Sequence, residues 1–311
     1  MKNTILGIHH ITAIAGDPKR NFDFYSKVLG LRFIKKTVNF DDPGTYHFYF
    51  GDEVGSAGTI LTFFPWGAGI PQGRRGSGMA TEIGYSVPKG GLEKWVERFE
   101  KYNVIYNKPS ERFGQRYLTF LDPDGLKLEF YEVENDTRKP WETNEVKADI
   151  ATRGFHNISI TLNSITGTAG ILTDIFGYKL IAQDGNRYRY AVDTVGQAAL
   201  VDLVELADEK LGHVANGTVH HVAFRVIDDE SLMYLREKVV AAGINITPLT
   251  DRNYFHSLYF REPGGVLFEI ATDNPGFMID ETLEDLGKGL KLPAKYENIR
   301  EDIEAHLVPL N

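Results

Sequence analysis

The sequence predicts an α+β fold in which four βαβββ units form two tandem domains. Four segments, beginning near Ile5, Met79, Gly154 and Thr218, each open with a strand-like run and continue through an amphipathic helix into further strands. Apolar residues make up 42% of the 311 residues and charged residues 25%, which is typical of a globular protein with its own core. The chain contains no cysteine, so this core must form without disulfides.

The first unit shows the pattern clearly. Residues 8–15 (IHHITAIA) are typical of a strand. Asp17 is a good N-cap for a helix over residues 18–30, where apolar side chains recur at helical spacing until Gly30 ends the helix. Aromatic and β-branched runs then predict three strands, at residues 32–40, 46–52 and 58–64.

The other units repeat this order. In the second we predict a strand, a helix and two strands, at residues 81–87, 91–103, 116–125 and 126–134. In the third we predict a strand, a helix and three strands, at residues 154–162, 169–177, 178–184, 187–192 and 198–205. In the fourth we predict a strand, a helix and two strands, at residues 219–226, 231–243, 256–265 and 266–273. The curved sheet of one unit cannot cover its own concave face, so the units must pair and enclose cups.

A polar stretch with Pro140 separates the two halves of the chain. We therefore predict an N-terminal domain at residues 1–134 with the first two units, and a linker at residues 135–153. A C-terminal domain with the other two units follows at residues 154–279, and then a tail at residues 280–311. The pattern within the tail predicts a helix from residue 294 to residue 307.

Charge and hydropathy exclude several classes of partner. The formal net charge is -9 and there is no dense Lys/Arg cluster, so we expect no nucleic-acid partner. No apolar run approaches the ~20 residues of a membrane span, and the first residues lack the apolar centre of a signal peptide. We expect a cytoplasmic protein without a membrane partner, and the sequence is compatible with a homo-oligomer.

Two histidine doublets occupy equivalent places in the first and fourth units. His9-His10 and His220-His221 both lie on the opening strand of their unit. Side chains alternate between the two faces of a strand, so one histidine of each doublet should point into the cup. The alignment of GIHHITAI with TVHHVAFR pairs His10 with His221 and pairs His9 with His220. We expect His9 and His220 to face away and to support the strands.

Glu269 lies among apolar neighbours on the last strand of the fourth unit, where an unpaired carboxylate would cost several kcal/mol. Two imidazoles and one carboxylate form the set that holds Fe(II) with positions left open. The sequence therefore predicts a metal site of His10, His221 and Glu269, which Mn(II), Zn(II) or Ni(II) could also use. The alternative is that the histidines are core residues and that Glu269 pairs with Arg252 or Arg261.

A second set occupies the equivalent places in the middle units. Glu129 lies at the end of the second unit, and Asn157 and Asp202 lie in the third. This set lacks an imidazole and would bind transition metals poorly. We expect a structural cup, with His156 one position out of register and facing away.

The four units resemble the vicinal oxygen chelate superfamily, which includes glyoxalase I, fosfomycin-resistance proteins and type I extradiol dioxygenases. Within it, the chain is most similar to the hydroquinone ring-cleaving dioxygenases of chlorophenol degradation and of bacillary methylhydroquinone resistance. The likeness extends over nearly the whole chain, through the blocks YHFYFGDEVGSAGT, ERFGQRY, RGFHN, DGNRYRY, TVHHVAF, DRNYF and PGGVLFE.

This resemblance implies glyoxalase-like tandem domains and an Fe(II) enzyme, with Mn(II) as the alternative, that opens a hydroquinone ring with O2. It places the metal on the second histidine of each doublet and on the glutamate of PGGVLFE, and thus between the first and fourth units. It also implies that Tyr259, Arg252, His9 and His220 surround the substrate. Two alternatives stay open: a glyoxalase-type lyase or isomerase, and a non-catalytic protein that binds or sequesters a small aromatic compound.

Overall fold

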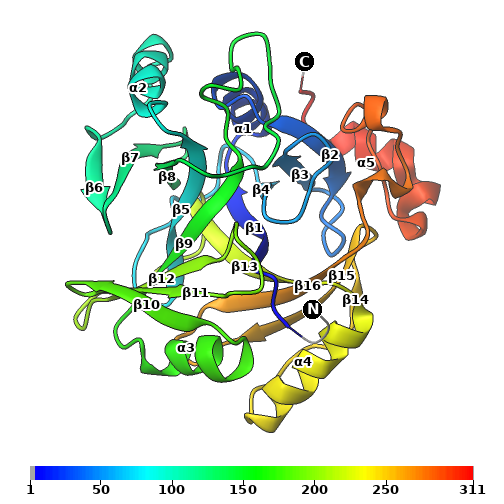
Figure 1. The fold of residues 1–311 in the computed structure, drawn as a ribbon. Helices are drawn as coiled ribbons and strands as arrows, with labels where there is room; N and C mark the ends of the chain where they lie inside the picture. Colours follow the sequence, from blue (N-terminus) through cyan, green and yellow to red (C-terminus); the bar gives the residue numbers. More distant parts are fainter. Residues whose placement is uncertain (1–3, 311) are drawn as a thin grey trace.

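The computed structural model describes residues 4–310, which form two eight-stranded sheets (Figure 1). Each of the four units has the βαβββ order, so the predicted α+β fold is confirmed. The first sheet has the strand order β14-β15-β16-β13-β1-β4-β3-β2, and the second has the order β10-β11-β12-β9-β5-β8-β7-β6. Within residues 4–310, no helix combines the length and apolar character needed to cross a membrane.

The first unit contains β1 (Ile8–Ala15), α1 (Pro18–Asp23) with a π-helical turn (Phe24–Val28), β2 (Arg32–Val38), β3 (Tyr46–Gly51) and β4 (Ile60–Pro65). Asp17 caps α1 as expected, because its side chain accepts a hydrogen bond from the backbone N–H of Arg20 at 2.7 Å. The second unit contains β5 (Met79–Pro88), α2 (Leu92–Lys101), β6 (Ser110–Arg112), β7 (Gln115–Leu121) and β8 (Lys127–Val133).

The third unit contains β9 (Gly154–Leu162), α3 (Thr166–Gly170) with a π-helical turn (Ile171–Ile175), β10 (Lys179–Asp184), β11 (Arg187–Ala191) and β12 (Leu200–Glu205). The fourth unit contains β13 (Thr218–Val226), α4 (Asp229–Ala241), β14 (Thr250–Asp251), β15 (Phe255–Arg261) and β16 (Leu267–Pro275). One continuous cluster of buried apolar side chains has members from all four units.

Two short strands, β6 and β14, were not predicted. Both are polar and very short, so they have no apolar alternation that a sequence pattern could reveal. They form because tight turns fold them onto β7 and β15. Phe113 and Gly114 adopt φ values of 51° and 72° in the β6–β7 turn, and Asn253 adopts a φ of 63° in the β14–β15 turn.

The two sheets each combine one unit from each half of the chain. The opening strands pair antiparallel, β1 with β13 in the first sheet and β5 with β9 in the second. The first unit therefore shares a sheet with the fourth, and the second with the third. This pairing brings the two histidine doublets onto adjacent strands.

The C-terminal tail packs along β2, the edge strand of the first sheet (Figure 1). A 3-10 turn at Phe277–Ile279 leads into the tail, which contains a second 3-10 turn at Leu283–Asp285, a 3-10 helix at Ala294–Ile299 and α5 (Arg300–His306). The predicted tail helix is thus confirmed, with 3-10 geometry in its first half. The tail covers a sheet edge that would otherwise expose unpaired backbone groups.

Candidate metal centre

His10, His221 and Glu269 converge in the first sheet, on β1, β13 and β16. The Nε2 atoms of His10 and His221 lie 3.1 and 2.9 Å from the same carboxylate oxygen of Glu269, and 3.4 Å from each other. Among residues 4–310, this is the only group of three His, Cys, Asp or Glu residues whose ligand atoms all lie within 4.8 Å of one another. The structure thus brings together the three residues expected as metal ligands.

Glu269 is fully buried, and beyond its contacts with the two imidazoles neither carboxylate oxygen has a hydrogen-bond partner. The alternative pairing with arginine does not occur, because Arg252 contacts Asp41 and Arg261 donates to the carbonyl of Gly265. Burial alone would raise the pKa of Glu269, but His10 and His221 hold it well below its usual value. A buried carboxylate that faces two imidazole nitrogens fits a divalent cation.

The histidine doublets depart from simple strand alternation. The register between β1 and β13 shifts by one residue at each doublet, so that His9 and His220 are the extra residues of two β-bulges. The expectation that His9 and His220 both face away therefore does not hold. His220 lines the same cavity as His10 and His221, whereas His9 lines a separate cavity.

The two rings of each doublet are joined through their Nδ1 atoms, at 2.9 Å for His9 and His10 and at 2.7 Å for His220 and His221. A lone pair on Nε2 of His10, which a metal ligand needs, requires the ring proton to be on Nδ1. In that tautomer Nδ1 of His10 donates to Nδ1 of His9, which accepts. Burial lowers the pKa of His9 well below its usual value and that of His220 to about 3, so both rings are neutral at neutral pH.

Replacement of His9 should show whether this residue binds the metal itself or only orients His10. In His9→Gln the amide oxygen can still accept from Nδ1 of His10, so we expect metal content to stay close to that of the native protein. In His9→Leu this acceptor is lost, and metal affinity should fall by about 10- to 100-fold. Metal titration of both variants checks this prediction, and loss of stoichiometric metal in His9→Gln would contradict it.

A cavity of about 290 Å³ lies beside the triad. Its apolar wall includes Phe40, Phe64, Trp66 and Phe255, and the Phe255 ring lies 4.9 Å from that of His10. This volume is at the small end of the range for ligand sites and suits a molecule with one aromatic ring.

Tyr259 and Arg252, both expected near the substrate, lie in the polar wall of this cavity. The Tyr259 ring lies 5.8 Å from that of His221, and Nε of Arg252 donates to the Tyr259 hydroxyl at 3.2 Å. Burial, with the Glu269 charge nearby, raises the pKa of Tyr259 well above its usual value. The Tyr259 hydroxyl therefore stays protonated, and its own proton can be donated into the cavity.

His47 and Thr62 belong to the site but were not identified from the sequence. Thr12 and Ala223 are equivalent residues, because each follows the second histidine of its doublet by two positions. Thr62 lies opposite Thr12 on the adjacent parallel strand, as Glu269 lies opposite Ala223. Thr62 is therefore the counterpart of Glu269 in the first unit. Its hydroxyl bonds to that of Thr12 at 2.8 Å and to Nε2 of His47 at 2.9 Å. Because a threonine occupies this position, the first unit contributes no carboxylate to the candidate site. An alignment of all four units at this position is the signal that could have found it.

The second cup consists of the counterparts Glu82, Glu129, Asn157 and Asp202 in the second sheet. Gly84 lies opposite Glu129 on the neighbouring strand, as Ala223 lies opposite Glu269. Glu82 precedes Gly84 by two residues, as His221 precedes Ala223, so Glu82 is the counterpart of His221. Glu129, Asn157 and Asp202 were predicted from the sequence, whereas Glu82 was not. His156 repeats the role of His9, because its Nδ1 bonds to the side-chain oxygen of Asn157 at 2.8 Å.

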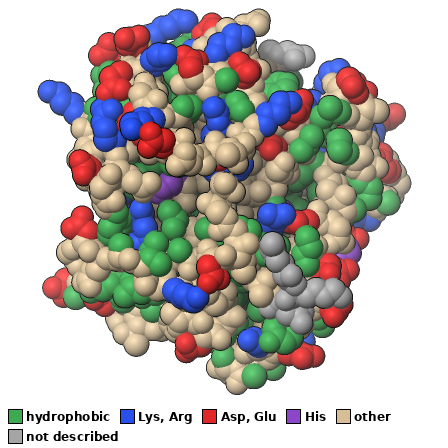
Figure 2. Space-filling view, viewed as in Figure 1, with side chains coloured by type: hydrophobic (Ala, Val, Ile, Leu, Met, Phe, Trp, Pro, Cys, Tyr) green, Lys and Arg blue, Asp and Glu red, His purple; other side chains and the backbone are tan. Residues whose placement is uncertain are grey.

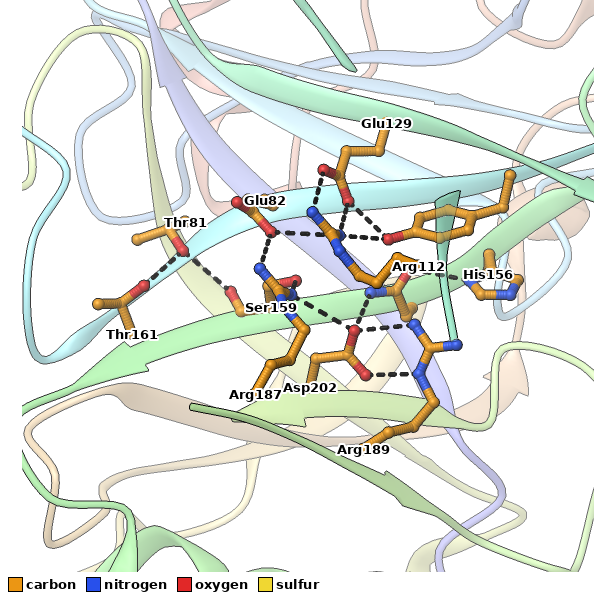
Figure 3. A network of polar contacts seen from close by, with 12 residues as sticks. Thr81, Glu82, Arg112, Glu129, His156, Ser159, Thr161, Arg187, Arg189 and Asp202 are labelled. Atoms are coloured by element: carbon orange, nitrogen blue, oxygen red, sulfur yellow. Dashed lines mark hydrogen bonds and ion pairs between the residues drawn. The ribbon is translucent and has the colours of Figure 1, made fainter. Parts of the chain in front are cut away.

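Arginine side chains fill the second cup (Figure 3). Arg112 pairs with Glu129 at 2.8 Å, Arg187 with Glu82 at 2.8 Å, and Arg189 with Asp202 at 2.7 Å through Nε. Burial would raise the pKa of Glu82, but Arg187 and Lys127 lower it to about 2. Each buried carboxylate thus has a guanidinium where a cation would otherwise be needed, which agrees with a structural cup.

A protein-family model matches two segments of the chain. Residues 7–130 and 154–270 match the model of the Glyoxalase/Bleomycin resistance protein/Dioxygenase superfamily. The chain is 48% identical to the "Putative ring-cleaving dioxygenase MhqO" of Bacillus subtilis (strain 168) over 311 residues, which cover 99% of this chain and 98% of the relative. It is 37% identical to the chlorohydroquinone/hydroquinone 1,2-dioxygenase of Sphingobium indicum over 305 residues, which cover 96% of this chain and 94% of that protein.

A solved structure agrees with these sequence matches. The crystal structure of a "putative dioxygenase" from Bacillus subtilis superposes on this chain with a TM-score of 0.95 at 46% identity. The superposition covers 99% of this chain and 98% of that one. These matches confirm the resemblance stated from the sequence.

Proposed function

Because the chain belongs to the Glyoxalase/Bleomycin resistance protein/Dioxygenase superfamily, we propose that it is an Fe(II)-dependent dioxygenase that opens a hydroquinone ring with O2. The observation that carries this proposal is the triad of His10, His221 and Glu269 at a small cavity with aromatic walls. Full-length relatives with the names of ring-cleaving dioxygenases support the reaction class.

His10, His221 and Glu269 would hold the metal. Thr62, at the position equivalent to Glu269 in the first unit, would add no charged ligand. Fe(II) in such a site supplies an electron path between the ring and O2 and lowers the pKa of a hydroxyl that it binds. Mn(II) is the alternative native metal, and the same ligands could carry Zn(II) or Ni(II) in a purified sample.

The wall residues would orient the substrate and stabilise the charge that develops on it. Arg252 donates to the hydroxyl oxygen of Tyr259, so the hydroxyl proton of Tyr259 is free for another acceptor. Tyr259 can therefore donate a hydrogen bond to the substrate oxygen that becomes anionic. Arg252 also reaches Asp41 at 3.2 Å at the cavity mouth, where it can meet the second hydroxyl of a para-diol. His220 extends the polar wall beside the ligand His221.

The partners we propose are therefore a small aromatic diol and O2. On the face shown in Figure 2, acidic and basic side chains are interspersed, and no extended basic surface suited to a polyanion gathers there.

We expect the iron-loaded enzyme to prefer para-diols over catechols. A wall built to pair the distant hydroxyl would leave a polar group unsatisfied when catechol binds, which can cost up to ~10⁴-fold in kcat/KM. Oxygen-electrode assays of methylhydroquinone, chlorohydroquinone and catechol on one anaerobically loaded preparation measure this ratio. Faster cleavage of catechol would refute the hydroquinone assignment, and turnover without O2 uptake would indicate a glyoxalase-type lyase or isomerase instead.

A further inference from the structure

The C-terminal tail contacts the wall of the candidate substrate cavity. Phe40 follows β2, is only 8% exposed and lines this cavity together with Asp41. The carbonyl oxygen of Phe40 accepts two hydrogen bonds from the tail, one from Nζ of Lys295 and one from the Tyr296 hydroxyl, both at 2.8 Å. The tail thus holds the backbone of a residue that shapes the cavity.

Other contacts anchor the tail to β2 independently of Phe40. Lys35 is fully buried, and its Nζ donates to the carbonyl of Phe277 at 3.0 Å and pairs with Asp280 at 2.6 Å. The backbone N–H of Lys291 donates to the carbonyl of Lys36 at 2.9 Å. Loss of the two donors to Phe40 therefore leaves the tail attached along β2.

The segment that contains Phe40 and Asp41 also contacts polar side chains near His10, His221 and Glu269. Asp41 pairs with Arg252 at 3.2 Å, and Arg252 donates to Tyr259 at 3.2 Å. A backbone hydrogen bond of 2.8 Å between Asn39 and Thr45 closes this segment into a turn. Displacement of the Phe40 carbonyl should therefore move the turn, and with it the apolar and polar sides of the cavity mouth.

We propose that Lys295 and Tyr296 are positioning residues that fix Phe40 and Asp41 in the cavity wall and thereby set the affinity for a one-ring aromatic diol. The identity of this ligand rests on the proposed function, whereas the contact between tail and wall does not. Neither residue touches the metal ligands, so their effect should appear in substrate binding.

The test compares the metal-loaded full chain with Lys295→Met/Tyr296→Phe, which keeps the bulk of both side chains but removes both donors. Glu297→Gln is the control, because Glu297 pairs with Arg300 within the tail. We expect KM for methylhydroquinone and its anaerobic Kd from calorimetry to rise about tenfold, equivalent to about 1.4 kcal/mol, with kcat and metal content within about twofold. Hydrogen exchange of residues 38–46 should become faster in the double variant and stay unchanged in Glu297→Gln.

An unchanged Kd and unchanged exchange in the double variant would overturn the inference, and so would a loss of kcat at constant KM and Kd. If no hydroquinone supports O2 uptake by the native protein, the proposed function fails, and the exchange of residues 38–46 still decides whether the tail fixes the wall. If the double variant does not fold, Tyr296→Phe alone carries the same test, with an expected rise in Kd of about threefold.

Discussion

Glu269→Gln is expected to remove tight metal binding and, with it, ring-cleaving activity. The substitution keeps the volume of the side chain but takes away the charge that faces His10 and His221. Loss of a supporting partner already costs a metal site about 10- to 100-fold in affinity, so loss of a ligand should cost at least about 100-fold. Metal analysis after dialysis, with Mn(II) or Fe(II) loaded anaerobically, measures the effect.

Thermal unfolding gives a second measure that does not depend on activity. A metal at a hundred times its Kd should stabilise the native protein by about 2.7 kcal/mol, and this gain should disappear in Glu269→Gln. The matched control is Glu129→Gln at the equivalent place in the second cup, where Arg112 is the partner. That variant should keep its metal and lose stability. Full metal occupancy in Glu269→Gln would show that the metal lies elsewhere.

Local patterns in the sequence were sufficient to predict the long elements of the fold. The strand at residues 8–15 and the cap at Asp17 agree with the structure residue for residue, because alternation and capping are local properties. The polar strands β6 and β14 could not be found in this way, since they depend on turn geometry and on pairing with a neighbour. The pairing of β1 with β13 joins residues about 200 positions apart, which no local pattern encodes.

The candidate ligands could be proposed because the repeats supply an internal comparison. His10 and His221 stood out as equivalent residues, and Glu269 as a charge among apolar neighbours. The bulges at His9 and His220 could not be foreseen, because a bulge is a mismatch between two strands and not a property of either one. His47 gave no signal either, since its role depends on its contact with Thr62 across the sheet.

The two cups compensate the charge of buried carboxylates in different ways. In both, carboxylates are buried at the middle of a sheet, where an unpaired charge is unstable. The first cup places imidazole nitrogens around one carboxylate, and the second places arginines against three. The second cup should therefore need no metal for its stability, and removal of a single charge should leave its partner buried and unpaired.

Asp202→Asn is the sharpest test of this second cup. Asp202 is fully buried, and its two oxygens accept from Nε and Nη2 of Arg189 at 2.7 and 2.9 Å, so the substitution leaves a buried guanidinium without its charge partner. We expect the free energy of unfolding to fall by about 3–5 kcal/mol in urea titrations, with metal content unchanged. The control Asp149→Asn breaks an exposed pair with Lys94 and should cost at most about 1 kcal/mol. Equal losses in the two variants would show that the arginine network does not stabilise the second sheet.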